Sequence, residues 1–366
     1  MVSILYFCQP FYFYDLKTFY LLISEVKIQN VKNIYTFRQQ FVHMEQKPII
    51  ILGEAILPGQ SKTIDMEIAR LHSTSKLKIP VIIERSETDG PVVLFSAGIH
   101  GDEINGVEIV RRILIEKINK PKIGTIICIP IINMFGFINK SRDFPDGRDL
   151  NRVFPGSSKG SLASRFASHI LSEIMPVVDY AVDFHAGGAS RFNAPQIRIV
   201  PENEGLKELA DIFNAPFTLY SKNITGSFRN ASEKMNIKML LFEGGKSLDI
   251  NKEIATLGLE GSKRFLNHFG MLDKCHTVNE APSKTIYINK SGWLRAKCSG
   301  LFHDNNLVGT FVEKGCILGF ITDPFGKFVQ KVKAPAAGYI INANLSPIVY
   351  EGDAVYHISN IFGEAT

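Results

Sequence analysis

Residues 92–103 read Val-Val-Leu-Phe-Ser-Ala-Gly-Ile-His-Gly-Asp-Glu. The first six residues are almost all apolar and a glycine follows them, which is typical of a strand buried on both faces. Residues 105–118 then place apolar side chains at a helical spacing. This stretch therefore predicts a strand followed by a helix, with His100 and Glu103 at the point where the strand ends.

Strands and helices alternate along the chain on both sides of this stretch. Similar patterns predict strands at residues 49–52, 61–71, 79–84, 124–132, 177–184 and 239–242. They predict helices at residues 162–175, 204–213 and 251–269. Such alternation indicates an α/β domain with a mostly parallel sheet flanked by helices. The ligand site is expected at the carboxyl ends of the strands.

The pattern changes beyond residue 282, where glycine-punctuated strands replace the helices. An internal repeat appears there, with a spacing of 37 residues: Val312, Gly315, Leu318 and Ile321 are matched by Val349, Gly352, Val355 and Ile358. Two related β-hairpin halves predict a small β-sandwich or barrel. We therefore expect an α/β domain over residues 44–282 and a C-terminal β domain over residues 283–366.

The composition is that of a soluble protein with a large core, with 45% apolar and 21% charged residues among 366. A net charge of +5 without a long basic run gives no reason to expect nucleic acid as a partner. No uninterrupted apolar run reaches the roughly 18 residues that span a bilayer, so no membrane association is expected. The five cysteines form no CxxC pair, which favours a reducing, cytoplasmic setting.

The first 43 residues are unusually aromatic, because 11 of the 38 aromatic residues precede Met44. The segment lacks the basic start, clean apolar core and cleavage site of a secretory signal. It is either an extension that docks on a partner or on the domain itself, or an upstream extension of the reading frame with the working start at Met44. We favour the second interpretation, since no motif described below lies in residues 1–43.

Polar residues follow three of the predicted strands, where a buried sheet would not need them. His100 and Glu103 follow the first strand, and His185 and Glu243 each end a later one. All three strand ends should meet at one edge of the sheet. Two imidazoles and a carboxylate leave the fourth position of a tetrahedral zinc for water. Each residue alone could equally pack or cap a loop, so the predicted metal site depends on their joint placement.

The loop at residues 140–156 is rich in Arg, Asp, Pro and Gly. In one interpretation its charges pair with each other in solvent. In the other, Arg142 and Arg152 direct their planar guanidinium groups at anionic oxygens of a ligand.

Four ordered motifs support a family resemblance: Ala-Gly-Ile-His-Gly-Asp-Glu at residues 97–103, Asp-Leu-Asn-Arg-Val-Phe-Pro-Gly at 149–156, Asp-Phe-His at 183–185 and Phe-Glu-Gly-Gly at 242–245. Together they resemble the succinylglutamate desuccinylase/aspartoacylase family, relatives of the zinc carboxypeptidases. The resemblance runs from about Ile51 to the C-terminus. It implies a zinc-carboxypeptidase-like fold with its catalytic domain at residues 44–282 and a hammerhead-like β domain after it.

The resemblance also implies roles for the residues of the metal site. His100, Glu103 and His185 would bind one Zn²⁺ per chain, and Glu243 would be the catalytic carboxylate. Zinc would lower the pKa of its bound water. Glu243 would take the proton of that water as general base and return it to the leaving amine.

Further roles concern the substrate. Asn151 and Arg152 would hold its carboxylate, and Arg142 would polarise the scissile carbonyl, a role for which Arg148 competes. Two more arginines, Arg191 and Arg198, either contact anions or are surface charges. The implied reaction is hydrolysis of the amide bond of a small N-acyl amino acid or related N-acylated amine, without an organic cofactor.

Other functions remain compatible with the sequence. A metallocarboxypeptidase acting on short peptides would use the same site, although a β domain over the mouth would exclude long chains. A non-catalytic ligand-binding relative would have no need of Glu243. A carrier domain would need a lysine at a hairpin tip, and Lys331 and Lys333 lie near such a position. A homo-oligomer is also compatible with the sequence.

Overall fold

The computed structural model describes residues 47–70, 76–281 and 284–364. The aromatic segment at residues 1–43 lies outside these ranges, so both interpretations of it stay predictions. Residues 48–366 form one compact unit. Within the described ranges, no helix is both long enough and apolar enough to cross a membrane.

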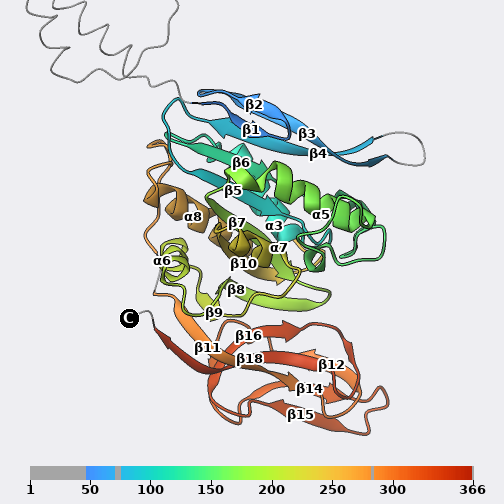
Figure 1. The fold of residues 1–366 in the computed structure, drawn as a ribbon. Helices are drawn as coiled ribbons and strands as arrows, with labels where there is room; N and C mark the ends of the chain where they lie inside the picture. Colours follow the sequence, from blue (N-terminus) through green and yellow to red (C-terminus); the bar gives the residue numbers. More distant parts are fainter. Residues whose placement is uncertain (1–46, 71–75, 282–283, 365–366) are drawn as a thin grey trace, which may run out of the picture. The chain divides into compact units, whose positions relative to one another are not determined.

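A sheet of twelve strands runs through the described residues (Figure 1). From one edge to the other, its strands are β13 (Phe311–Val312), β16 (Gly338–Asn344), β18 (Ala354–Glu364), β11 (Ile286–Arg295), β9 (Phe217–Tyr220), β8 (Arg191–Ile199), β10 (Lys238–Lys246), β7 (Tyr180–Gly187), β5 (Val92–Ala97), β6 (Thr125–Ile129), β4 (Lys76–Arg85) and β3 (Ser61–Arg70). β1 (Ile49–Ile51) and β2 (Glu54–Ile56) form a separate antiparallel pair.

The long sheet is mixed, because antiparallel strands are added to the parallel strands that the sequence predicts for the α/β part. Two runs of neighbouring strands are parallel: β10, β7, β5 and β6 in the centre, and β8, β9 and β11 beside them. β8 runs antiparallel to β10, and β4 runs antiparallel to β6. Only residues 188–190 connect β7 to β8, and a parallel crossover needs a dozen or more residues. The short connection therefore reverses the chain.

Helices cover both faces of the central strands. α3 (Ile104–Ile115), α6 (Glu204–Phe213) and α8 (Lys252–His268) contribute to one apolar cluster, while α5 (Leu162–Glu173) and α7 (Phe228–Lys234) contribute to another. All six residues of β5 are buried, which confirms the strand covered on both faces. The helix expected at residues 204–213 is confirmed with the same bounds.

The C-terminal strands contribute to two sheets. β12 (Gly300–Asp304), β14 (Ile317–Thr322), β15 (Val329–Lys333) and β17 (Ile348–Val349) form a four-stranded sheet, whereas β11, β13, β16 and β18 extend the long sheet. A domain boundary near residue 282 therefore stays a prediction. Lys331 and Lys333 lie within β15, while Lys327 lies in the connection between β14 and β15.

Matching positions of the internal repeat have similar backbone conformations and pack in one cluster. Gly315 and Gly352 occupy equivalent turns with φ of 87° and 90°, in the left-handed region that favours glycine. The six apolar residues of the repeat share one buried cluster: Val312, Leu318, Ile321, Val349, Val355 and Ile358. The two halves therefore stabilise each other through a common core.

A close backbone contact supports the turn that carries His100. A Cβ added to Gly101 would lie 2.0 Å from the carbonyl carbon of Gly136 and 2.1 Å from the nitrogen of Phe137, both in α4 (Met134–Asn139). Backbone atoms at that distance cannot give way without moving the helix. Only glycine therefore fits between His100 and α4.

We expect Gly101→Ala to lower the free energy of unfolding by about 1–3 kcal/mol or more, as overpacking does in other cores. Urea denaturation measures the change. The matched control is Gly363→Ala, because a Cβ there meets nothing within 4 Å. Equal stability of the two variants would contradict the close contact.

Candidate metal centre and active site

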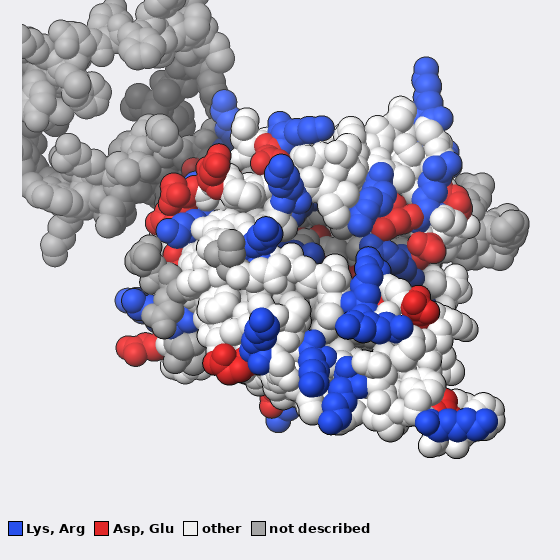
Figure 2. All heavy atoms as spheres, turned by 90° about the horizontal axis from the view of Figure 1, so that it is seen from below, with Lys and Arg blue, Asp and Glu red and all other residues white. Residues whose placement is uncertain are grey.

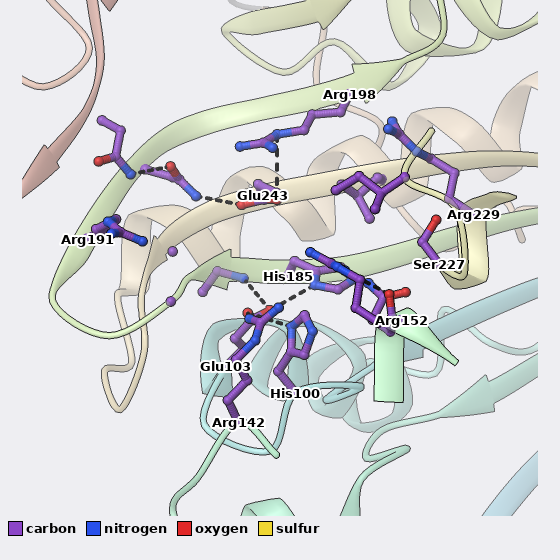
Figure 3. A pocket seen from close by; sticks show the side chains of 18 of the residues that line it. His100, Glu103, Arg142, Arg152, His185, Arg191, Arg198, Ser227, Arg229 and Glu243 are labelled. Atoms are coloured by element: carbon purple, nitrogen blue, oxygen red, sulfur yellow. Dashed lines mark hydrogen bonds and ion pairs between the residues drawn. The ribbon is translucent and has the colours of Figure 1, made fainter. Parts of the chain in front are cut away.

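A pocket of about 210 Å³ lies at the edge where the central strands end. The nine residues that sequence patterns and the family resemblance single out all line it: His100, Glu103, Arg142, Asn151, Arg152, His185, Arg191, Arg198 and Glu243. Figure 3 labels most of these side chains and shows them directed toward a common space from several strands and loops. Arg148 is exposed, faces Asp146 at 3.7 Å and does not line the pocket.

Glu103 lies between two imidazoles. Its Oε1 is 2.7 Å from Nδ1 of His100, and its Oε2 is 2.8 Å from Nδ1 of His185. All three side chains are buried, and their candidate ligand atoms lie within 4.8 Å of one another. At these distances each Nδ1 either donates an N–H to the carboxylate or binds a metal ion together with it.

Two further carboxylates orient the imidazoles. Nε2 of His100 lies 3.2 Å from Oδ1 of Asp149, and Nε2 of His185 lies 2.8 Å from Oδ2 of Asp183. A carboxylate only accepts, so each Nε2 carries its proton and each Nδ1 can offer a lone pair to a metal. Two histidine nitrogens and one glutamate oxygen are a donor set that fits zinc.

The electrostatics of this cluster favour positive charge. Burial alone would lower the pKa of His185, but the Asp183 and Glu103 carboxylates raise it well above the usual range. Burial would also lower the pKa of His100, and Glu103 and Asp149 raise it. Burial would raise the pKa of Glu103, yet the two imidazoles hold it well below its usual value. The cluster therefore stabilises a cation.

Arg142 joins the cluster from the predicted loop. It donates from Nη2 to Oδ2 of Asp149 at 2.8 Å, and its Nη1 lies 3.3 Å from Oε1 of Glu103. Asn133 donates to the backbone carbonyl of Arg142 at 3.2 Å and so holds this part of the loop. The structure thus brings Arg142, rather than Arg148, to the pocket.

Asn151 and Arg152 lie in the short 3₁₀ helix η1 (Leu150–Arg152). Oδ1 of Asn151 accepts from the backbone N–H of Phe228 at 2.8 Å, which leaves Nδ2 as the side-chain donor for a ligand. Arg152 donates from Nη1 to the carbonyl of Asn151 at 2.7 Å, and its side chain is 41% exposed. Its other N–H groups can therefore face a ligand.

Glu243 lies on β10 beside His185 of β7, since the two are register partners. Its Oε2 accepts from Nδ2 of Asn193 at 2.5 Å, and its Oε1 lies 3.5 Å from Nε of Arg198. The side chain is 14% exposed. This carboxylate is thus separate from the His-Glu-His cluster but opens into the same pocket.

Sequence reasoning did not single out several residues that line the pocket, among them Asn193, Arg229, Trp293 and Asn342. Asn193 lies on β8, a strand that was not predicted because Pro195 interrupts its pattern. Trp293 and Asn342 come from β11 and β16, far from any motif. Trp293 stacks on His357 with ring centroids 4.6 Å apart.

Arg229 adds a partly satisfied cation to the pocket. It donates from Nη2 to Oγ of Ser221 at 3.1 Å, while its buried Nη1 has no hydrogen-bond partner. Burial, together with the nearby Arg198, lowers the pKa of Arg229 to about 10. A negatively charged ligand group would pair with the free Nη1 and would favour the charged form of Arg229.

The pocket carries an excess of positive charge. Five arginines line it against two glutamates: Arg142, Arg152, Arg191, Arg198 and Arg229 against Glu103 and Glu243. Figure 2 shows basic side chains gathered beside a hollow on one face of the molecule. A small anionic ligand suits such a pocket.

Residues 89–269 match the sequence model of the succinylglutamate desuccinylase/aspartoacylase catalytic domain. The chain belongs to this family. The matched region contains all nine of the residues singled out in the sequence, whereas Trp293 and Asn342 lie beyond it.

Similar proteins extend the likeness over most of the chain. The N-alpha-acetyl-L-2,4-diaminobutyric acid deacetylase of Halomonas elongata is 25% identical over 297 residues, covering 77% of this chain and 86% of that protein. A succinylglutamate desuccinylase/aspartoacylase structure from Rhodobacter sphaeroides has a TM-score of 0.71 at 24% identity, covering 84% of this chain and 95% of its own.

A third relative comes from Ruegeria pomeroyi. The product-bound structure of its ectoine utilization protein EutE (DoeB) has a TM-score of 0.72 at 22% identity, covering 86% of this chain and 99% of its own. These structures share the mixed α/β fold of the family.

We expect Asp183→Asn to weaken Zn²⁺ binding about 10- to 100-fold, because the outer carboxylate that orients His185 is lost. Titration of metal-free protein against a chromogenic chelator measures the dissociation constant. Asp143→Asn is the matched control, since Asp143 is an exposed acid of the neighbouring loop. Unchanged affinity in Asp183→Asn would show that this carboxylate does not orient a ligand.

Proposed function

We propose that this chain is a zinc-dependent hydrolase that cleaves the amide bond of a small N-acyl amino acid or related N-acylated amine. One observation carries the proposal: a separate carboxylate, Glu243, opens into the same arginine-lined pocket as the His-Glu-His cluster. A pure metal-binding site would need no such carboxylate. The deacetylase activity in the name of the Halomonas elongata relative supports the same reaction class.

His100, Glu103 and His185 would hold the zinc ion. When bound, zinc supplies Lewis acidity and lowers the pKa of water to about 7. The chain's own contribution is to fix both Nδ1 atoms through Asp149 and Asp183. This arrangement keeps the ligands in place before the ion arrives.

Glu243 would move the proton. It would accept a proton from the attacking water as general base and donate it to the leaving amine as general acid. Asn193 fixes one carboxylate oxygen, so the other is the one that faces Arg198 and the pocket. The breaking C–N bond would thus have a proton donor within the pocket.

The arginines would bind the anionic parts of the substrate. Arg142 would stabilise negative charge on the carbonyl oxygen, a contribution worth about 2.7–4 kcal/mol in other enzymes. Asn151 Nδ2 and the Arg152 fork would hold a carboxylate. Arg191, Arg198 and Arg229 would bind a further anionic group.

A small substrate is favoured over a peptide. The pocket measures about 210 Å³, and Trp293 and Asn342 of the C-terminal strands form part of its wall. Long chains would have to pass that wall. Because the wall hinders long chains but leaves room for short ones, a metallocarboxypeptidase acting on short peptides is the second candidate.

The cysteines bear on the compartment in which the protein works. In the described part of the chain, Cys128, Cys275, Cys298 and Cys316 form no disulfide, as a reducing compartment would allow. We propose a cytoplasmic location on this basis. Homo-oligomer formation stays a prediction.

We expect Glu243→Gln to lower kcat about 10²- to 10⁴-fold, because the glutamine amide cannot carry the proton. A panel of N-acyl amino acids with detection of the released amine measures kcat, and metal analysis shows whether zinc is retained. The control is Glu253→Gln, an exposed residue of α8. Hydrolysis at the wild-type rate in Glu243→Gln overturns the mechanism.

We expect Arg152→Ala to raise KM about 10- to 100-fold for substrates with a free carboxylate, since a hydrogen bond to a charged group contributes about 1.5–3 kcal/mol. The corresponding neutral amides should show no such change. Arg148→Ala is the matched control, because this arginine of the same loop does not line the pocket. An equal rise in KM for both substrate types would contradict the carboxylate role.

A further inference from the structure

Two asparagines connect the C-terminal strands to Glu243. Asn342 on β16 donates from Nδ2 to Oδ1 of Asn193 on β8, at 2.5 Å. Asn193 donates in turn from Nδ2 to Oε2 of Glu243 on β10, at 2.5 Å. Figure 3 shows dashed contacts that end at Glu243 from this side and from Arg198. Both asparagines are almost fully buried, with 4% and 3% exposure for Asn193 and Asn342.

The direction of both hydrogen bonds, from Asn342 to Asn193 and from Asn193 to Glu243, is fixed. An ionised carboxylate can only accept, so Asn193 must present its Nδ2 to Glu243. Its Oδ1 then faces Asn342, which must present its own Nδ2. The strand register supports this geometry, because Asn342 and Asn193 are direct partners across β16 and β8.

The buried amide of Asn342 is costly. Its Oδ1 has no hydrogen-bond partner, and a buried unpaired acceptor lowers stability. An apolar side chain would avoid this cost. The hydrogen bond that Asn342 donates to Asn193 therefore explains the residue better than packing does.

Arg198 competes for the same carboxylate. Its Nε is buried without a hydrogen-bond partner and lies 3.5 Å from Oε1 of Glu243. A small rotation of Glu243 would complete this ion pair. The hydrogen bond from Asn193 opposes that rotation.

We propose that Asn342 and Asn193 are positioning residues that hold Glu243 in its working orientation and away from a full ion pair with Arg198. The inference rests on the proposed function, in which Glu243 carries the proton. It makes β16, which lies beyond the matched catalytic region, a functional part of the active site.

The test compares Asn342→Ala, Asn193→Ala and the double variant. We expect each single variant to lose kcat about 10- to 100-fold, as misplacement of a reacting group does in other enzymes. The double variant should lose no more than Asn193→Ala, because Asn342 acts only through Asn193. KM should stay within about 3-fold of wild type.

A second variant keeps the shape of the side chain. Asn342→Asp is isosteric but offers no Nδ2 donor, so it should lose kcat as Asn342→Ala does. It also serves if Asn342→Ala fails to fold. The matched control is Asn344→Ala on the same strand, which should keep wild-type kcat because Asn344 hydrogen-bonds to the Ser346 backbone instead.

Substrate binding has its own readout. The chain has one tryptophan, and Trp293 lines the pocket, so quenching of its fluorescence reports binding without turnover. We expect an unchanged Kd in Asn342→Ala. A weakened Kd that accounts for the whole loss of kcat/KM would assign Asn342 to binding and overturn the positioning role.

The outcomes separate the two proposals. If the wild type is active but Asn342→Ala keeps full kcat, the positioning role of the asparagines is overturned and the proposed function stands. The same holds if the losses of kcat in Asn342→Ala and Asn193→Ala multiply in the double variant. A wild type that hydrolyses no N-acyl compound overturns both. A crystal structure of Asn342→Ala tests the positioning role without measuring turnover. Glu243 should turn toward Arg198 in this variant, and an unmoved Glu243 contradicts the proposal.

Discussion

The site depends on one carboxylate with two imidazole partners. Glu103 occupies the N-cap position just before helix α3, yet its side chain makes no capping hydrogen bond to that helix. Its two oxygens face His100 and His185 instead, and Oε2 also accepts from the backbone N–H of Ala186 at 3.1 Å. The turn after β5 is thereby joined to the end of β7. This bridge brings the two histidines, which Asp149 and Asp183 orient, to one place where they can share a ligand.

A series of hydrogen bonds connects the rest of the pocket to Glu103 and its two histidines. Asp149 links His100 to Arg142, which brings in the loop at residues 140–156. Asn151 then ties the loop to the start of α7 through the Phe228 backbone. Glu243 lies on the neighbouring strand and reaches the pocket from the opposite side, where the C-terminal strands support it. The charged groups next to the His-Glu-His cluster are thus paired with one another, as buried ionic groups need to be.

Local sequence patterns predicted the parts of the site that follow strands. The apolar run of β5 and the polar residues after it identified His100 and Glu103, and helix α6 was predicted with its observed bounds. The choice between Arg142 and Arg148 needed the structure, because a contact from Asn133 places the backbone. Asn342 could not be predicted at all, since it meets Asn193 across 149 residues through strand register alone.

The continuous sheet has a consequence for how the chain matures. The first residues of β8, and β9 along its outer edge, pair with β16 and β11, which are synthesised near the end of the chain. During synthesis these strands present open edges, which are prone to pair with other chains. The pocket wall that carries Trp293 and Asn342 is also missing at that stage. A ribosome-bound chain therefore lacks part of its pocket wall until its last strands have joined the sheet.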